Sequence, residues 1–376
     1  MALGPAARLV RLFPLAALAS LAALAACTPA SRPEPSRPLA TTRAPAPASR
    51  RTFTVTYRRA ANAFVVIDEV SAWHPDKHDP AVRAAWKARF GIDDADAARL
   101  AAWGAVRKRA WVEEGGSSSI LLGRAKPLDR VAAAFLAEDA IEAALARAAA
   151  VVGAEDAATL RATFAALQPK LDAVLADCRA FVPAAEELQR RLDAPAVADF
   201  VARLARFYRA GDVPPLTVSF AWWPLEESSS ASVTGDVLLL RYDPIRRAAD
   251  AGKDVDVPVH EVVHFVSTRQ PEAQKAALSE AFATKCGELP AIAPPRLLEE
   301  PLAVAHQKMF LARVEPARFD RERGWYGDPW VSLMAKALYE PLVQAHADGR
   351  VLDERLALAA GRACRELASI PKSIGR

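Results

Sequence analysis

The chain has 376 residues, of which 52% are apolar and 25% charged, a composition that supports a hydrophobic core and excludes a wholly disordered chain. The formal net charge is +4, but seven of the 49 basic residues and one of the 45 acidic residues lie in the first 51 positions, so the remainder carries −2. Such a near-neutral body shows no stripe of clustered lysine and arginine, and we expect no nucleic-acid partner.

The N-terminus has the pattern of an export signal. A basic start containing Arg8 and Arg11 precedes an apolar run, LFPLAALASLAALAA. This run is too short for a comfortable membrane span, which needs about 20 residues, and is typical of the central region of a signal peptide. We therefore predict a signal peptide over residues 1–26.

The run ends in Leu24-Ala25-Ala26-Cys27, which resembles a bacterial lipobox. The resemblance implies that Cys27 becomes the lipidated first residue of the mature chain and anchors it to a membrane. An ordinary secretory signal with an incidental cysteine is the alternative. Thr28 follows in place of the aspartate associated with inner-membrane retention, so we expect an envelope protein of the outer membrane, facing the periplasm or the surface.

Residues 27–51 are rich in proline, alanine, serine and arginine and have no apolar periodicity. Such a segment cannot bury enough surface to fold, and we predict a semi-extended tether.

The body divides by composition near Pro215. Residues 52–214 are expected to form an N-terminal, mostly helical lobe. It opens with two short predicted strands, at 52–58 and 63–69, and continues with alanine-rich helical periodicity over 79–210.

Residues 215–376 are expected to form a second, catalytic lobe. Two β-prone stretches flank the polar segment LEESSSASVTG and predict a hairpin with a long tip. Helical periodicity follows, and the fold class is α+β, predominantly helical, with a small antiparallel sheet. The expected strands are 216–224 and 236–244, and the expected helices are 256–269, 272–285, 297–313 and 328–347.

Three cysteines remain in the body: Cys178, Cys286 and Cys364. An exported protein can hold disulfides, but the count is odd. One disulfide with one buried thiol, or three buried thiols, both fit, and the sequence does not fix the pairing.

Residues 257–267 read VPVHEVVHFVS, with two histidines four apart and a glutamate after the first. The valines favour a strand, in which Glu261 would point away from both histidines. In a helix, His260 and His264 stack one turn apart and Glu261 lies about 100° round. Pro258 suits a first helical turn, with Asp254 or Asp256 as the cap, so we predict a helix.

Chance gives two histidines at this spacing around a glutamate in roughly one chain of this composition in two hundred. We therefore interpret His260 and His264 as metal ligands, with a hydrogen-bonded core pair as the alternative. A catalytic zinc site needs a third protein ligand and keeps a position for water.

The His-Glu-Val-Val-His stretch, taken with Leu298-Glu299-Glu300-Pro301-Leu302-Ala303, resembles the two motifs of gluzincin zinc metallopeptidases. The resemblance covers about 260–310 and implies a zincin-like domain holding one Zn²⁺. Glu300 takes the ligand place, with Glu299 as its substitute and His306 as a third candidate. A glutamate and a proline stand where the family has asparagine and glycine, and the spacing from His264 is longer.

The same resemblance implies a mechanism and a substrate. Glu261 would act as general base on a metal-activated water, and Tyr326 or Tyr339 would stabilise the oxyanion. Trp222 and Trp223 lie on the stretch that would form the edge strand along which a peptide or protein substrate aligns, with ordinary packing as the equal alternative.

The other histidines, His74, His78 and His346, receive no metal role, and His346 is expected to be solvated. Two further functions stay open: a lipid-anchored metal-binding scaffold without turnover, and a zinc hydrolase of a cell-wall amide. Zinc binding without hydrolysis would favour the first, and cleavage of peptidoglycan the second.

Overall fold

Helices dominate the part of the chain that the computed structural model describes, which comprises residues 51–74, 78–113, 128–226, 230–287 and 294–368. The predicted signal peptide, Cys27 and the tether lie outside these residues. The described residues, from Arg51 onward, belong to one compact unit. No helix of the described residues is both long and apolar enough to cross a bilayer.

The predicted helical region over 79–210 is confirmed where the structure describes it, over 79–113 and 128–210. Local signals set several of its boundaries: the Asp79 side chain caps one helix by accepting from the Ala81 amide at 2.8 Å, and Pro195 opens another. The helices of this half are α1 (Arg59–Ser71), α2 (Pro80–Phe90), α3 (Asp94–Glu113), α4 (Arg130–Leu136), α5 (Ile141–Val152), α6 (Ala154–Asp177), α7 (Phe181–Leu192) and α8 (Pro195–Tyr208).

The four helices predicted in the second half are confirmed, and the short helix α9 and the longer α14 were missed. Asp328 caps α13 through the amides of Trp330 and Val331, and Pro329 occupies its first turn. The helices are α9 (Ala248–Ala251), α10 (Asp256–Ser267), α11 (Glu272–Cys286), α12 (Pro294–Val314), α13 (Pro329–Ala347) and α14 (Glu354–Ala368), with 3₁₀ turns at Cys178–Ala180 and Pro316–Arg318.

The sheet has four strands in the order β1-β2-β4-β3 and is mixed, which corrects the expected antiparallel sheet. β1 (Phe53–Thr56) and β4 (Val237–Tyr242) both run parallel to β2 (Leu216–Trp222), and β3 (Ser230–Thr234) pairs antiparallel with β4. The hairpin is therefore β3–β4, and β4 returns in the direction of β2. Alternating apolar residues reveal strands but not their partners.

The predicted strand at 63–69 is wrong, because these residues belong to α1. Nearly all of α1 is buried, from Ala60 to Val70, so its apolar residues show no single face. A short, continuously apolar run does not distinguish a buried strand from a buried helix. The Asn62 side chain fastens α1 to β2 by donating to the Phe220 carbonyl at 2.7 Å and accepting from the Trp222 amide at 3.1 Å.

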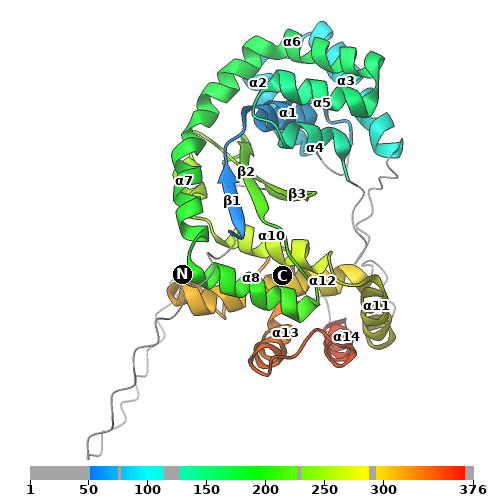
Figure 1. The fold of residues 1–376 in the computed structure, drawn as a ribbon, viewed down its shortest axis with the longest axis vertical. Helices are drawn as coiled ribbons and strands as arrows, with labels where there is room; N and C mark the ends of the chain where they lie inside the picture. The colour runs from blue at the N-terminus through cyan, green and yellow to red at the C-terminus, as the bar shows by residue number, and fades with distance from the viewer. Residues whose placement is uncertain (1–50, 75–77, 114–127, 227–229, 288–293, 369–376) are drawn as a thin grey trace, which may run out of the picture. The chain divides into compact units, whose positions relative to one another are not determined.

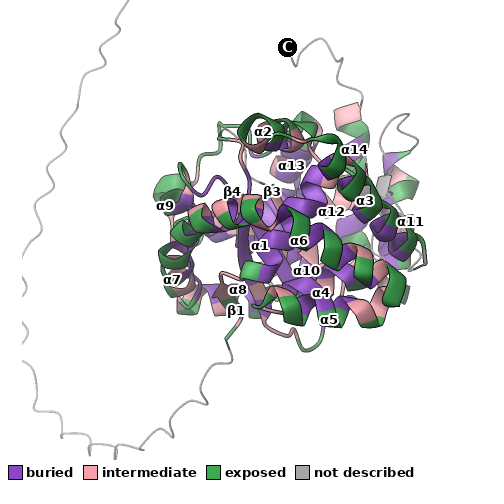
Figure 2. Ribbon diagram, turned by 90° about the horizontal axis from the view of Figure 1, so that it is seen from above, coloured by how far each residue is buried: buried purple, intermediate pink, exposed green. Residues whose placement is uncertain are grey.

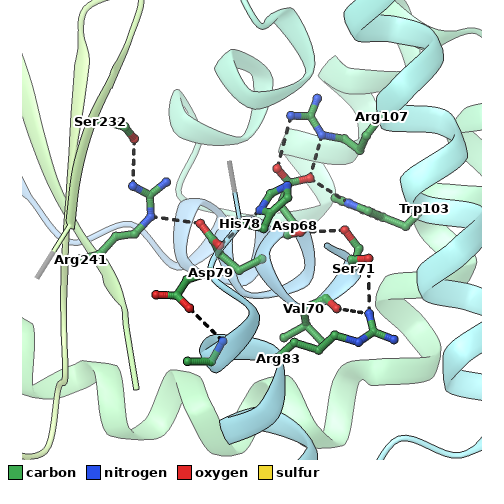
Figure 3. A network of polar contacts seen from close by, with 12 residues as sticks. Asp68, Val70, Ser71, His78, Asp79, Arg83, Trp103, Arg107, Ser232 and Arg241 are labelled. Carbon is green, nitrogen blue, oxygen red and sulfur yellow. Dashed lines mark hydrogen bonds and ion pairs between the residues drawn. The ribbon is translucent and has the colours of Figure 1, made fainter. Parts of the chain in front are cut away.

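A buried polar network joins the sheet to the helices of the first half (Figure 3). Arg107 of α3 pairs with Asp68 of α1 at 2.8 Å, and Asp68 also accepts from the Trp103 indole at 2.9 Å. On the other side of α1, Glu69 contacts His78 at 3.2 Å and Arg241 of β4 at 3.5 Å. The network fixes α1 between the sheet and α3, because a buried charge without a partner is costly.

α10 lies beneath the sheet with α8 and α12 nearby, and α11 and α14 form a neighbouring pair (Figure 1). α1 and α10 are largely buried, whereas α6 and α7 expose one face (Figure 2).

A Cys286–Cys364 disulfide joins α11 to α14, and Cys178 is a buried free thiol. Gly361 allows the close approach, since a Cβ there would come 2.5 Å from the Phe282 carbonyl oxygen. β1 belongs to the expected N-terminal lobe, but it pairs with β2 in the sheet whose other strands belong to the expected second lobe.

Candidate metal centre

The VPVHEVVHFVS stretch forms helix α10, as predicted, although it contains five valines. Pro258 lies in its first turn, where a missing amide hydrogen costs nothing.

The expected N-cap of α10 is wrong: the helix follows Val255 without a side-chain cap. Asp254 instead accepts from the Tyr242 hydroxyl at 2.6 Å, and Asp256 pairs with Arg318 at 2.7 Å. Burial raises the pKa of Asp256 to about 6, against the effect of Arg318.

His260 and His264 lie on one face of α10, one turn apart. Their Nε2 atoms are 3.2 Å apart and their ring centroids 4.9 Å. Both side chains are mostly buried, at 11% and 18% exposed. The helical interpretation of the motif therefore brings together the two nitrogens that a shared ion requires.

Glu300 of α12 completes this group. Its two carboxylate oxygens lie 3.1 Å from Nε2 of His260 and 3.2 Å from Nε2 of His264. One ligand atom from each residue falls within 4.8 Å of the others. Ligands at about 2.0–2.1 Å from a tetrahedral ion lie roughly 3.3 Å from one another, so these separations fit one face of such a site. Two imidazoles and one carboxylate are also a donor set that suits zinc.

Glu299, the alternative ligand, occupies a different place. Its Oε1 lies 3.1 Å from Nδ1 of His264, on the ring edge that faces away from Glu300. A carboxylate at this nitrogen fixes the tautomer and orientation of a ligand histidine. The two adjacent glutamates thus contact the two nitrogens of one imidazole, an arrangement that the sequence left open.

The charges of the group reinforce one another. Burial alone would lower the pKa of His264, but hydrogen bonds to Glu299 and Glu300 and the charge of Glu261 raise it to about 10. Burial would raise the pKa of Glu300, but both histidines hold it well below its usual range. In the metal-free protein His264 is therefore protonated beside the carboxylates of Glu299 and Glu300, and a cation bound at its Nε2 would take the place of that proton.

Tyr326 lies beside His260 and Glu300. Its ring is nearly parallel to that of His260, with centroids 6.2 Å apart, and the residue is 43% exposed. Burial of its hydroxyl, and then the charge of Glu300 and a hydrogen bond to it, raise the pKa of Tyr326, as does Glu261. The phenol is therefore protonated at neutral pH and able to donate. Tyr339 instead packs within the core against Phe319, at 5.5 Å.

Trp222 and Trp223 do not line an open surface. They are 3% and 6% exposed, and Trp222 packs edge-to-face on Trp86 at 6.1 Å. β2, which ends at Trp222, is a central strand, so the expectation of an edge strand there is wrong. β1 and β3 form the two edges of the sheet, and β3 contacts α10. The alternation of apolar and polar residues predicted that β2 is a strand, but it could not show how many strands pair with it.

The remaining histidines lie elsewhere. His306 is fully buried and donates from Nδ1 to the Leu302 carbonyl at 2.8 Å, and its Nε2 lies 3.0 Å from Nε2 of His346. His346 is thus half-buried rather than solvated. His78 contacts Glu69, and His74 packs edge-to-face on Trp73, with ring centroids 5.3 Å apart. None of these four belongs to the group of ligands found among the described residues.

No family model, curated protein or solved structure matches this chain. The assignment of a role therefore depends on the geometry of the site.

Proposed function

We propose that the protein is a zinc-dependent hydrolase of peptide bonds, of the gluzincin type. The observation that carries the proposal is the convergence of His260, His264 and Glu300, whose facing atoms lie 3.1–3.2 Å apart. These three residues would hold one Zn²⁺. The ion, when bound, would supply a Lewis acid that lowers the pKa of a water molecule toward neutrality.

The chain's own residues would carry the protons. Glu261 follows a ligand histidine on α10, and its charge raises the pKa of both His264 and Tyr326, which supports a position near the proposed metal. It would take a proton from the attacking water and pass it to the leaving amine. The protonated hydroxyl of Tyr326 would donate a hydrogen bond to the oxyanion that develops on the scissile carbonyl.

The edge strand β3 favours an extended peptide as substrate. Among the described residues β3 pairs with β4 alone, and it contacts the ligand helix α10. The free edge of a strand can bind a peptide by main-chain hydrogen bonds, which would lay the peptide across α10.

We also propose that Cys27 carries a lipid and holds the enzyme in the cell envelope. Metabolic labelling with palmitate would test this proposal, and the label should be lost in Cys27→Ala.

The deciding experiment measures zinc and hydrolysis together. We expect about one zinc per chain in the parent and in Glu261→Gln, but hydrolysis of a peptide library reduced by at least about 10²-fold in the variant, because only the proton carrier is lost. Glu300→Ala should lose zinc. If the protein binds zinc but hydrolyses neither peptides nor purified peptidoglycan, the proposed enzymatic activity is refuted, and a role as a metal-binding scaffold is the remaining hypothesis.

Tyr326→Phe tests the oxyanion donor. We expect unchanged zinc content and a fall in kcat of about 10²-fold, in the range seen when one such donor is removed. Tyr339→Phe, in the core, is the matched control and should keep kcat. Equal loss in both variants would assign Tyr326 a structural role only.

A further inference from the structure

Helix α8 packs against α12 and α13 through two aromatic contacts. Phe200 contacts Phe310 of α12 with ring centroids 5.2 Å apart. Phe207 stacks on His346 of α13 with centroids 4.6 Å apart. Arg203 is three residues after Phe200 and four before Phe207, so it lies on the same face of α8. These contacts therefore hold Arg203 at the junction of the three helices, where it is half-buried.

Two further arginines are neighbours of Arg203. Arg206 lies in the last turn of α8 and Arg313 in the last turn of α12, and both are exposed. Burial, and then the charge of Arg313, lower the pKa of Arg203. The charges of Arg203 and Arg206 both act on His346. We call Arg203, Arg206 and Arg313 the arginine cluster.

The arginine cluster has no ionic partner. None of its three side chains makes a hydrogen bond or an ion pair among the residues that the structure describes. Asp199, one turn before Arg203 on α8, attracts it without forming an ion pair. Other arginines are paired, such as Arg59 with Asp172 at 2.6 Å. Like charges held close together oppose one another, so a bound anion would stabilise the cluster.

The chemistry of the cluster favours phosphate as that anion. A guanidinium group presents its donors in a planar fork that matches two oxygens of a phosphate. Nucleic acids are an unsuitable partner, because their binding proteins neutralise many phosphates along an extended basic surface, whereas the body of this chain carries a net charge of only −2. A surface with separate phosphate groups fits three arginines better.

The cluster lies on the helix that begins where the described chain enters the body. Arg51 precedes β1 and pairs with Asp193 at 3.5 Å, and α8 begins two residues later, at Pro195. From Pro195 to Arg206 the helix rises about 16 Å. The proposed anchor, Cys27, is about 24 residues before Arg51, and a proline-rich segment of that length spans at most about 75 Å. Anchoring would therefore give the cluster a high effective concentration of lipid head groups.

We propose that Arg203, Arg206 and Arg313 form a docking surface for the phosphate head groups of an anionic membrane, and that this surface holds the body against the membrane to which the chain is anchored. The choice of a membrane rests on the proposed anchor at Cys27, but not on zinc or on hydrolysis. Because the contact is electrostatic, it weakens as the ionic strength rises.

The test measures binding of the full-length Cys27→Ala chain, the parent, which cannot carry the lipid. Vesicles of phosphatidylcholine, with and without phosphatidylglycerol, are compared at about 0.1 M salt. Replacing all three arginines of the cluster by glutamine should weaken binding to the anionic vesicles on the order of a hundredfold, since each arginine at such a surface contributes about fivefold. Binding to phosphatidylcholine alone should not change, and it measures what the predicted signal peptide contributes.

Two control variants make the test specific. Arg99→Gln, Lys108→Gln and Arg161→Gln together remove the same charge from exposed positions of α3 and α6, which lie away from α12 and α13 (Figure 1). This control should bind anionic vesicles within about twofold of the parent, because salt screens charges more than about 10 Å away. Lysine at all three cluster positions keeps the charge and should retain most of the binding.

Three results would overturn the proposal: equal binding of the parent and the glutamine variant to anionic vesicles, equal weakening in that variant and the α3–α6 control, or equal loss in the lysine and glutamine variants. Displacement of the parent by a few millimolar inorganic phosphate at constant ionic strength would also overturn it, by assigning the cluster to free phosphate. A protein that binds no zinc, or that fails to take up palmitate, would refute the hydrolase or the anchor and leave arginine-dependent vesicle binding intact.

Discussion

The molecule contains two pairs of histidines whose Nε2 atoms nearly touch, and the pairs differ in almost everything else. In the first pair, His260 and His264 lie 3.2 Å apart beside Glu299 and Glu300. In the second, His306 and His346 lie 3.0 Å apart, and the ring of His346 stacks on Phe207 with centroids separated by 4.6 Å.

Their protonation states differ as a result: His264 of the first pair is held positive, and both histidines of the second pair are held neutral. The carboxylates raise the pKa of His264 to about 10. Burial lowers the pKa of His306 to about 3, assisted by His346, and burial with the charges of Arg203 and Arg206 lowers the pKa of His346 to about 4. Close imidazoles alone therefore do not make a cation site. The carboxylate that faces both Nε2 atoms of the first pair makes the difference.

The largest effect should come from removing one histidine of each pair. His260→Ala should lower the affinity for zinc by more than about a hundredfold, since a direct ligand contributes more than an outer-shell partner. His306→Ala is the matched control and should keep zinc while it lowers the free energy of unfolding, because it opens a cavity in the core. Chelator competition and denaturant unfolding measure the two quantities. Loss of zinc in both variants would contradict the comparison.

The second pair should make the protein sensitive to acid. The pKa values of His306 and His346 lie below the value of about 6.5 for an unfolded chain, so the unfolded state binds protons first. Their stabilising effect is complete above about pH 6.5 and is lost as the pH falls toward 4. The free energy of unfolding should decrease by up to about 1.4 kcal/mol per pH unit for each histidine.

His346→Phe isolates this effect. Phenylalanine retains the stacking on Phe207 but does not titrate, so the slope of stability against pH between 6.5 and 4 should be smaller than in the parent. The difference between parent and variant cancels the contribution of the first pair. Parallel curves for the two proteins would show that the second pair is not held neutral.

The smallest effect should come from the contact behind the metal ligand. Glu299→Gln keeps the shape but removes the charge at Nδ1 of His264, and we expect zinc affinity to fall by about 10–100-fold. This loss should be smaller than that of Glu300→Gln, which removes the charge of a ligand. The reverse order would make Glu299 the ligand. Glu272→Gln, on α11, changes a carboxylate that pairs with Lys275 and serves as the control.

The sequence predicted the parts of the site that lie on one helix better than the parts that depend on packing. The spacing of His260, Glu261 and His264, with Pro258 in the first turn, was enough to place them correctly. It did not distinguish Glu299 from Glu300, because neighbouring positions on α12 differ by about 100° and only the docking of α12 on α10 selects one. The strand predicted at 63–69 was wrong for a related reason. This segment of α1 is fully buried, so its apolar residues lack the periodicity that distinguishes a helix from a strand.

The sequence by itself determined the predominantly helical composition, the helix that carries two imidazoles on one face, and the few acidic residues available as a third ligand. These are local properties, governed by spacing along the chain and by the conformational limits of proline. Tertiary structure decided which glutamate meets the imidazoles, which strand forms the sheet edge, and which histidines become neutral. Those outcomes depend on contacts between segments far apart in sequence, where burial and neighbouring charges set the energy.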